Sequence, residues 1–398
     1  MTSIDGMVDD VDATFDDMVD VRRELHRHPE LGFEETATTA LVRSRLATLG
    51  LTDVPVATPT GAAYTLTGGR PGRPVVLRAD LDALPITEEH RFPFASAVEG
   101  SMHACGHDAH TATLLGVAQV LAGRAEDLCG TYTFVFQPAE ELLGGAGQMV
   151  AGGLLDGLEG GVTLGYHVAS ALPAGLVGIR AGITMAEVHT FRLVLRGPGG
   201  HGAFANQGGD VVRAICDAVS RLGDVVDGLD YEQVPCVCSA GIVRAGTAPN
   251  VVPDHASLNG TLRTFTEHHR VEALERLRTV CDRVGRDHGV AVELEVPWSA
   301  PAVVNDPSIT GAVTQVARAQ LGPDKVLAMP PVTPSDDVSV FLQRLPGCYF
   351  FVGGGLADGT SGVHHSPAFA IDESAMRVAA RLLVGAAAAL ADEATQLG

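Results

Sequence analysis

Apolar residues in the N-terminal part of the chain follow two spacings. Helical spacing predicts amphipathic helices over 14–28 and 34–50, separated by the helix breakers Pro29 and Gly32. A third helix is predicted over 111–121. Short, uninterrupted apolar runs predict buried strands at 75–79, 132–136 and 162–166. Strands that alternate with helices indicate an α/β layer around a mostly parallel sheet.

The pattern changes near residue 184. Apolar and polar residues then alternate, as they do in a strand with one buried face. The expected elements are strand 190–196, helix 210–226, strands 234–243 and 255–264, helix 267–288 and strand 290–296. The order β-α-β-β-α-β is typical of a compact four-stranded sheet with two helices on one face.

After Pro297 the sequence again shows the pattern of alternating helices and buried strands seen in the N-terminal part. The expected elements there are helices 306–320, 335–343 and 372–392 and strand 348–352. We therefore predict an α/β domain formed by 1–183 and 298–398. An α+β domain at 184–297 is inserted into it.

Composition narrows the classes of partner. The 398 residues suggest about two domains. A net charge of -21 disfavours binding to nucleic acid or to an anionic membrane. Met1–Asp20 lacks a signal-peptide pattern, and the Ala-rich tail is interrupted at Asp392, so no membrane span is expected. Seven scattered cysteines, an odd number, indicate reduced thiols and predict a cytoplasmic protein.

The densest group of reactive side chains lies at 102–111, just before a predicted helix. His103, Cys105, His107, Asp108 and His110 fall within eight residues. Cysteine and histidine are the ligands that zinc and similar ions prefer, and α/β sheets place their sites at this end. Cys105 could instead be a small buried residue and Asp108 a helix cap, but we favour a metal site.

Two adjacent carboxylates, Glu140 and Glu141, follow the strand at 132–136. Two carboxylates at a strand end are costly unless they are exposed or put to use. One can bind a metal ion while the other acts as a general base on a water molecule. A solvated acidic loop explains the pair equally well on this observation alone.

Three further histidine positions are weaker signals. His167 follows a predicted strand, the pair His364-His365 precedes Pro367, and His201 lies among glycines in the inserted domain. Each alone is compatible with a structural residue or a plain turn. Their joint occurrence at strand ends and in Gly/Pro loops indicates that they converge on one site.

With these residues the chain resembles dinuclear metallopeptidases of the aminoacylase and carboxypeptidase-G type. Within them it looks like the branch of hippurate hydrolases and indole-acetyl-amino-acid amidohydrolases. The resemblance runs from Arg23 to Pro367 and is most specific at 78–85, 105–111, 137–141 and 246–253. It implies a zinc-peptidase-like catalytic domain. It also implies a ferredoxin-like inserted domain that acts as a lid and forms a homodimer.

The resemblance also implies roles for individual residues. Glu140 matches the general base, and Asp82 matches an aspartate that orients a ligand histidine. Where the wider superfamily has a further histidine, this chain has Asp80. Two divalent ions, Zn or Mn, are implied, with the cysteine thiolate bridging them. The residues that match the ligands are Cys105, His107, Glu141, His167 and His365.

In the inserted domain the residues that match substrate contacts are His201, Asn250 and Arg263. Arg263 or Asn250 would hold the free carboxylate of the substrate, which a guanidinium can bind through two hydrogen bonds. The chain departs from the branch at Asp336-Asp337-Val338, where Glu-Asp-Phe is usual. His364 competes with His365 for the ligand position, and the spacing to Phe369 favours His365.

Together these features predict a metal-dependent amidohydrolase that cleaves N-acyl amino acids, with Glu140 as base and His201 assisting at the oxyanion. Two alternatives stay open. One is a dipeptidase or aminopeptidase, which needs a site for a free α-amine. The other is a catalytically silent metal-binding protein on the same scaffold.

Overall fold

The computed structural model describes residues 4–207 and 209–392, which form two compact units. The larger unit comprises 1–182, 304–329 and 337–398, and the smaller unit comprises 183–303 and 330–336. The sequence pattern placed the inserted domain at 184–297. The smaller unit extends a few residues past that range and also includes a short returning segment.

The larger unit is built on an eight-stranded sheet with the order β1-β2-β4-β3-β5-β18-β6-β17. The four central strands, β4, β3, β5 and β18, are parallel to one another, and antiparallel strands flank them. The predicted α/β class with a mostly parallel sheet is therefore confirmed. The strands are β1 (Thr52–Val54), β2 (Ala62–Thr67), β3 (Arg70–Asp80), β4 (Cys129–Gln137), β5 (Val162–Pro173), β6 (Val177–Ile179), β17 (Val326–Ala328) and β18 (Gly347–Gly355).

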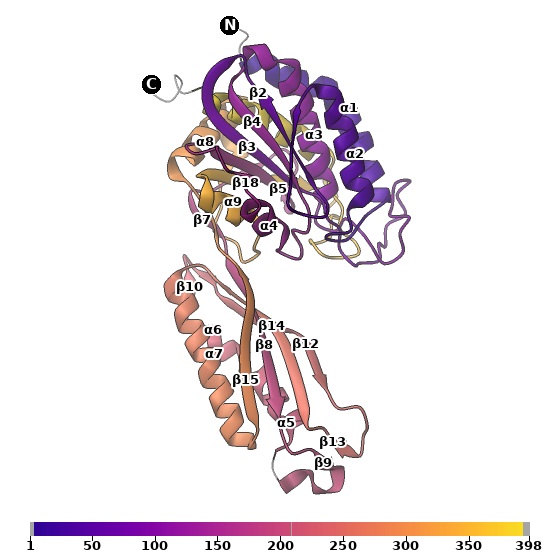
Figure 1. Ribbon diagram of the computed structural model, residues 1–398, viewed down its shortest axis with the longest axis vertical. Helices are drawn as coiled ribbons and strands as arrows, with labels where there is room; N and C mark the ends of the chain where they lie inside the picture. The colour runs from indigo at the N-terminus through magenta and orange to yellow at the C-terminus, as the bar shows by residue number, and fades with distance from the viewer. Residues whose placement is uncertain (1–3, 208, 393–398) are drawn as a thin grey trace. The chain divides into compact units, whose positions relative to one another are not determined.

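Helices cover both faces of this sheet, because its central strands are apolar on both sides. Val75 and Leu77 of β3 pack into a cluster with α1, α3 and α10, whereas Val76 faces a second cluster with α4 and α9. Figure 1 shows α1, α2 and α3 side by side over the N-terminal strands. The helices are α1 (Ile4–Arg27), α2 (Thr36–Leu46), α3 (His107–Gly123), α4 (Gly145–Ala151), α8 (Pro307–Leu321), α9 (Val338–Arg344) and α10 (Ser374–Ala391).

Helix α10 is long and apolar enough to cross a membrane by length and composition alone. It is 72% buried within the larger unit, where it packs against α1, α3 and α8. Its apolar character is that of a core helix.

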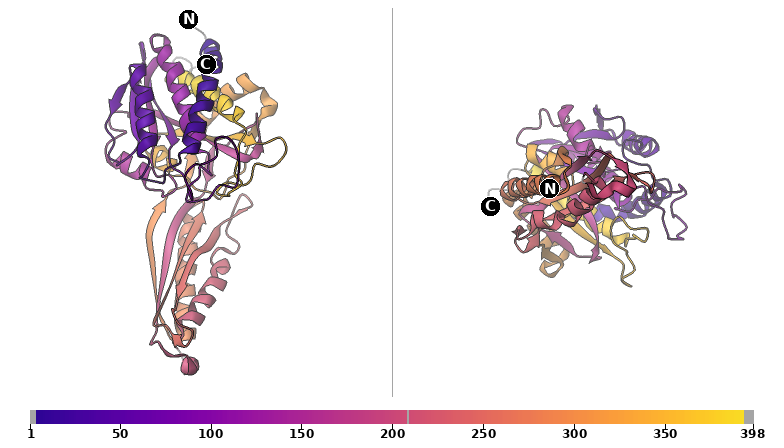
Figure 2. Two further views of the ribbon diagram at one scale, coloured as in Figure 1. Left: turned by 90° about the vertical axis from the view of Figure 1, so that its right-hand side faces the viewer. Right: turned by 90° about the horizontal axis from the view of Figure 1, so that it is seen from below.

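The smaller unit contains a four-stranded antiparallel sheet with the order β12-β14-β8-β15. Its helices lie on one face of that sheet (Figure 2). Side chains of the helices and the sheet form a hydrophobic cluster separate from those of the larger unit. The chain order is the predicted β-α-β-β-α-β. The main elements are β8 (Glu187–Arg196), α5 (Val211–Ser220), α6 (Leu222–Val226), β12 (Val237–Ala245), β14 (His255–Thr264), α7 (Glu267–His288) and β15 (Ala291–Ala300). Shorter strands are β7 (Gly182–Met185), β9 (Gly200–His201), β10 (Asp230–Tyr231), β11 (Val234–Pro235), β13 (Val251–Val252) and β16 (Val303–Asn305).

Several predicted bounds were wrong. The single helix expected at 210–226 is two helices that meet at Arg221. The strand expected at 234–243 is divided after Pro235, which lacks the N–H that a continuous ladder needs. The helix expected at 335–343 begins at Val338. Strand β5 continues to Pro173, so His167 lies within a strand and not after one.

Candidate metal centre and active site

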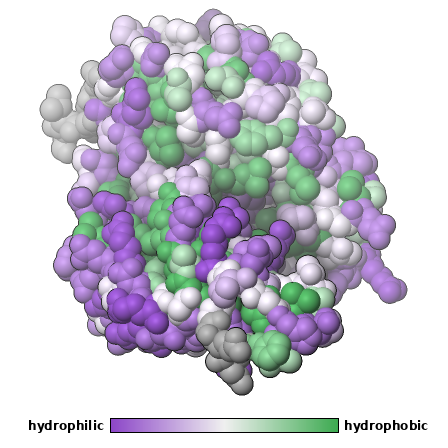
Figure 3. All heavy atoms as spheres, turned by 60° about the horizontal axis from the view of Figure 1, so that its bottom comes forward, coloured by the Kyte–Doolittle hydropathy of each residue, from purple (hydrophilic) through white to green (hydrophobic). Residues whose placement is uncertain are grey.

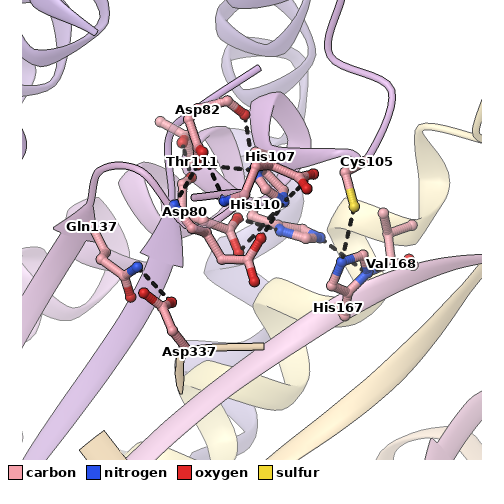
Figure 4. Close-up of polar contacts among 12 residues, drawn as sticks. Asp80, Asp82, Cys105, His107, His110, Thr111, Gln137, His167, Val168 and Asp337 are labelled. Carbon is pink, nitrogen blue, oxygen red and sulfur yellow. Dashed lines mark hydrogen bonds and ion pairs between the residues drawn. The ribbon is translucent and has the colours of Figure 1, made fainter. Parts of the chain in front are cut away.

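The site lies at the carboxyl ends of the parallel strands of the larger unit, where several strands end in polar residues. Asp80 ends β3 and pairs with Gln137, which ends β4. Arg78 pairs with Gly165, so His167 on β5 falls in line with Asp80. Helix α3 begins with His107 at this same edge (Figure 4). Open α/β sheets place ligands beyond the carboxyl ends of their strands.

The five predicted metal ligands meet here. Ligand atoms of Cys105, His107 and Glu141 all lie within 4.8 Å of one another. The Cys105 sulfur also lies 3.4 Å from Nε2 of His167, and Nε2 of His365 lies 3.2 Å from Oε1 of Glu141. Cys105 is common to two groups of candidate ligands, Cys105-His107-Glu141 and Cys105-His167-His364, and the second group contains His364 in place of the predicted His365.

Hydrogen bonds on the far side of two imidazoles leave the inner nitrogen for a cation. Nδ1 of His107 donates to the Asp82 carbonyl at 2.8 Å, and Nδ1 of His167 donates to the Val168 carbonyl at 2.7 Å. A carbonyl only accepts, so the proton of each neutral ring is on Nδ1 and Nε2 is the nitrogen that could bind a cation. Nε2 of His107 and Oε1 of Glu141 are buried without a hydrogen-bond partner among the described residues. A buried nitrogen and a buried oxygen of this kind fit a divalent ion.

Two other imidazoles have the opposite arrangement. Nε2 of His110 accepts the N–H of Val168 at 3.0 Å, and Nε2 of His364 accepts the N–H of Ser170 at 3.2 Å. A backbone N–H only donates, so the proton of each neutral ring is on Nδ1. His110 then donates to Asp80 at 2.6 Å, and His364 donates to the Cys105 sulfur at 3.7 Å. This pattern favours His365 over His364 as a ligand.

The electrostatics of the site favour cations. Burial alone would lower the pKa of His107, but the carboxylates of Asp80, Asp82 and Glu141 raise it to about 10. Burial, Glu141 and Glu140 raise the pKa of the Cys105 thiol well above its usual value. Both shifts arise because negative charge gathers in a site from which water is largely excluded. A divalent ion would compensate that charge.

Glu140 and Glu141 owe their placement to Asp82. The two consecutive N–H groups donate to the Asp82 carboxylate, at 3.0 Å from Glu140 and 2.9 Å from Glu141. Oδ1 of Asp82 also lies 3.3 Å from Nδ1 of His107. The Glu140 carboxylate is buried and reaches 3.9 Å from Nε2 of His107, so it faces the ligand cluster.

A buried network behind the ligands was not predicted as part of the site. The guanidinium of Arg78 donates to Asp80 at 2.7 Å, to Gln137 at 2.8 Å and to Asp337 at 3.1 Å. Asp337 also accepts from Gln137 at 2.7 Å and from the Ala146 N–H at 3.1 Å. The signal available in the sequence was a charged Arg78 at the end of an apolar strand.

The three predicted substrate residues lie at two places in the smaller unit. Strand β9 pairs with β13, and the Gly202 N–H donates to the Asn250 carbonyl at 2.8 Å, so His201 and Asn250 are neighbours. Arg263 on β14 donates to Ser335 at 2.9 Å.

The register of the sheet separates these two places. Arg263 pairs with Val188, whereas His255, at the end of β14 toward β13, pairs with Arg196. Eight residues of strand at about 3.3 Å each separate them by roughly 26 Å. His201 and Asn250 therefore lie at the other end of the sheet from Arg263.

The sequence profile of Peptidase family M20/M25/M40 matches residues 76–389. The chain belongs to this family. It is 38% identical over 367 residues to an N-acetylcysteine deacetylase of Bacillus subtilis, covering 92% of this chain and 94% of the relative. It is 39% identical over 319 residues to an N-acyl-L-amino acid amidohydrolase of Geobacillus stearothermophilus, covering 79% and 86%.

Among solved structures, the chain is similar to a dinuclear metal-binding peptidase of the M20 family from Bacillus subtilis. The TM-score is 0.80 at 33% identity, and the match covers 96% of this chain and 99% of the other. The family resemblance inferred from the sequence is thereby confirmed. The chain is a metal-dependent hydrolase of the M20 family, and Cys105 belongs to two groups of side chains that could hold metal ions.

Proposed function

We propose that this member of the M20 family hydrolyses the amide bond of N-acyl amino acids. The observation that carries the proposal is the pair Glu140 and Glu141. Glu141 has a buried oxygen with no hydrogen-bond partner among the described residues, in the group that it forms with Cys105 and His107. Glu140 lies 3.9 Å from Nε2 of the same His107. The names of the relatives in Bacillus and Geobacillus support this substrate class.

We assign the ions to Cys105, His107, Glu141, His167 and His365. Divalent ions held there would polarise the amide carbonyl and acidify the attacking water. Zinc and manganese both suit a set of one thiolate, three imidazoles and one carboxylate.

Glu140 takes the proton from the attacking water and later delivers it to the leaving amine. Asp82 fixes the tautomer of His107 and holds the backbone that presents Glu140. His201 would donate to the oxyanion, and Arg263 or Asn250 would bind the free carboxylate of the substrate.

We infer that the enzyme is a homodimer through the smaller unit. Arg263 lies roughly 26 Å along β14 from His255, and His201 on β9 lies near the His255 end, so the two side chains are too far apart for both to contact one small substrate. A second copy could supply His201. The edge strand β12 exposes Ile242 and Val243, 45% and 48% exposed, and an exposed apolar edge is suited to pairing. Figure 3 shows hydrophobic side chains among the hydrophilic surface in its view.

Mixing two inactive variants tests the dimer. His201→Ala and Glu140→Gln homodimers should each be nearly inactive, whereas a mixture should regain activity if one subunit completes the site of the other. Ile242→Lys should convert the dimer to monomer in sedimentation and abolish the complementation. A fully active monomer would contradict the inference.

We further propose that the enzyme works in the cytoplasm on a small molecule, without nucleic-acid or membrane partners. The net charge of -21 and the seven free cysteines support this proposal.

A substrate panel tests the reaction. Purified protein of known metal content is offered acetyl, benzoyl and indole-acetyl amino acids, and release of the free amino acid is measured. Chelation should abolish release, and Zn or Mn should restore it. Glu140→Gln should keep its metal but lose roughly three orders of magnitude in turnover. Hydrolysis that persists after verified removal of metal, or in Glu140→Gln, would refute the mechanism.

A further inference from the structure

Glu35 is a buried carboxylate for which the mechanism above has no use. It precedes α2 and is fully buried, yet its side chain does not cap that helix. Oε1 accepts the N–H of Ala139 at 2.8 Å, and Oε2 accepts the hydroxyl of Thr60 at 2.6 Å. None of its interactions among the described residues involves a cation. A carboxylate buried this way is costly, so these two contacts are the reason to look for a role.

The contact with Ala139 falls on a strained turn. Ala139 has a φ of 53°, in the left-handed region that residues with a Cβ rarely adopt. The turn is further closed by the Leu143 N–H, which donates to the Glu140 carbonyl at 2.6 Å. Such a backbone persists only where surrounding contacts hold it.

Two buried carboxylates hold three consecutive N–H groups of this turn. Glu35 accepts from Ala139, and Asp82 accepts from Glu140 and Glu141. The segment that carries Glu35 also lies directly against the turn, since a Cβ on Gly32 would come 3.2 Å from the Ala139 Cα.

We propose that Glu35 is a positioning residue for catalysis, which fixes the Ala139 backbone so that the adjacent Glu140 carboxylate faces the metal centre. The proposal rests on the assignment of Glu140 as general base. Without Glu35, Ala139 can relax to an ordinary φ, and the side chain that follows it turns away. Asp82 still accepts the N–H groups of both glutamates, but Glu141 lies one residue further from Ala139, so the ligand set remains.

Glu35→Ala should lower kcat by roughly 10- to 100-fold, the usual range for residues that orient a catalytic group, without a matching change in KM or metal content. Glu35→Gln should restore most of kcat, because its amide oxygen can accept from Ala139 and its NH2 can donate to Thr60. Glu35→Asp, one methylene shorter, cannot reach both partners and should behave like Ala. It serves in place of Glu35→Ala if that variant does not fold.

Glu30→Ala is the matched control. Glu30 accepts from the N–H groups of Ala37 and Thr38 and from the Thr36 hydroxyl at the start of the same helix. Its loss should destabilise α2 and leave kcat unchanged per folded molecule. A kcat in Glu30→Ala as low as in Glu35→Ala would reduce Glu35 to a general stabiliser of α2 and overturn the proposal.

A double variant separates the proposal from the function on which it rests. In a Glu140→Gln background, Glu35→Ala should cause no further loss, because both changes remove the same contribution. A full additional loss would overturn the proposal, as would wild-type kcat in Glu35→Ala. Failure of the proposed function would show separately, as normal turnover in Glu140→Gln. The rate of hydrogen exchange at the Ala139 amide should also rise in Glu35→Ala and stay slow in Glu35→Gln. An unchanged rate in both variants would contradict the proposal that Glu35 fixes the Ala139 backbone.

Discussion

Replacing Asp82 by Asn changes a single atom of a buried group that makes two hydrogen bonds at once. Oδ1 and Oδ2 of Asp82 each accept one N–H, from Glu140 and Glu141, and the residue is 1% exposed. Asn offers one oxygen and one NH2 group. Whichever way the amide turns, an NH2 donor faces a backbone donor in a site where water cannot separate them.

The magnitude follows from that count. A hydrogen bond to a charged group contributes about 1.5–3 kcal/mol net, and a buried donor left unsatisfied costs about 1–3 kcal/mol. Asp82→Asn should therefore lower the free energy of unfolding of the metal-free protein by roughly 2.5–6 kcal/mol. It should also lower kcat by about 10- to 100-fold, since the loop that carries Glu140 loses an orienting contact.

Urea unfolding followed by circular dichroism measures the first effect, and turnover of the metal-loaded protein measures the second. Asp53→Asn is a matched control, because the carboxylate of Asp53 is exposed and bonds to Arg43 at the surface. Its effect should stay within about 0.5 kcal/mol. If Asp82→Asn lowers the free energy of unfolding no more than the control does, the two hydrogen bonds from Asp82 to the Glu140 and Glu141 N–H groups do not stabilise the loop.

Two further predictions follow from the imidazoles. Burial lowers the pKa of His26, but Asp108 and then Glu88 raise it above its usual value overall. The stabilisation that charged His26 provides is therefore full below about pH 6.5, the unfolded pKa, and is lost as pH rises through the higher folded pKa. His26→Gln should cost more stability at pH 6 than at pH 9 in urea unfolding, and equal costs would contradict the sign. His365→Ala should lower the metal content of the protein, whereas His364→Ala should keep it and shift the sulfur-to-metal absorption of a cobalt-loaded sample. Equal metal loss in both variants would reverse the ligand assignment.

The buried central strands of the fold were predictable from the sequence, whereas its short outer strands and one helix break were not. Strands β3, β4 and β5 are apolar on both faces, so each appears as a continuous apolar run. Strands β1, β6 and β17 have three residues each, which is too short for an apolar run to indicate a strand. The predicted helix divides at Arg221, two residues before Gly223, and a single glycine is too weak a signal to predict the division because helices tolerate it.

The site was predictable where a residue type limits the chemistry. Cysteine, histidine and paired carboxylates near strand ends have few uses besides metal binding and proton transfer. Glu35 and Asp337 were not predictable, because a carboxylate beside a helix start or a loop is ordinarily solvated. Only the fold shows that both are buried against the loop that follows β4. The tautomers of His364 and His365 likewise depend on which backbone groups surround each ring.

The same loop explains how two adjacent glutamates can take different roles. Asp82 accepts the backbone N–H of both glutamates, so their different roles must come from the contacts of their side chains and from the residue that precedes Glu140. Glu141 points Oε1 at Nε2 of His107 and at Nε2 of His365, 4.0 and 3.2 Å away. Glu140 follows Ala139, whose left-handed φ turns the chain just before it. In the metal-free protein this arrangement combines like charges, burial and backbone strain, each of which costs stability. A pair of cations would offset the repulsion between like charges and the cost of burying them. The atoms that destabilise the metal-free loop are therefore the ones that an ion would bind.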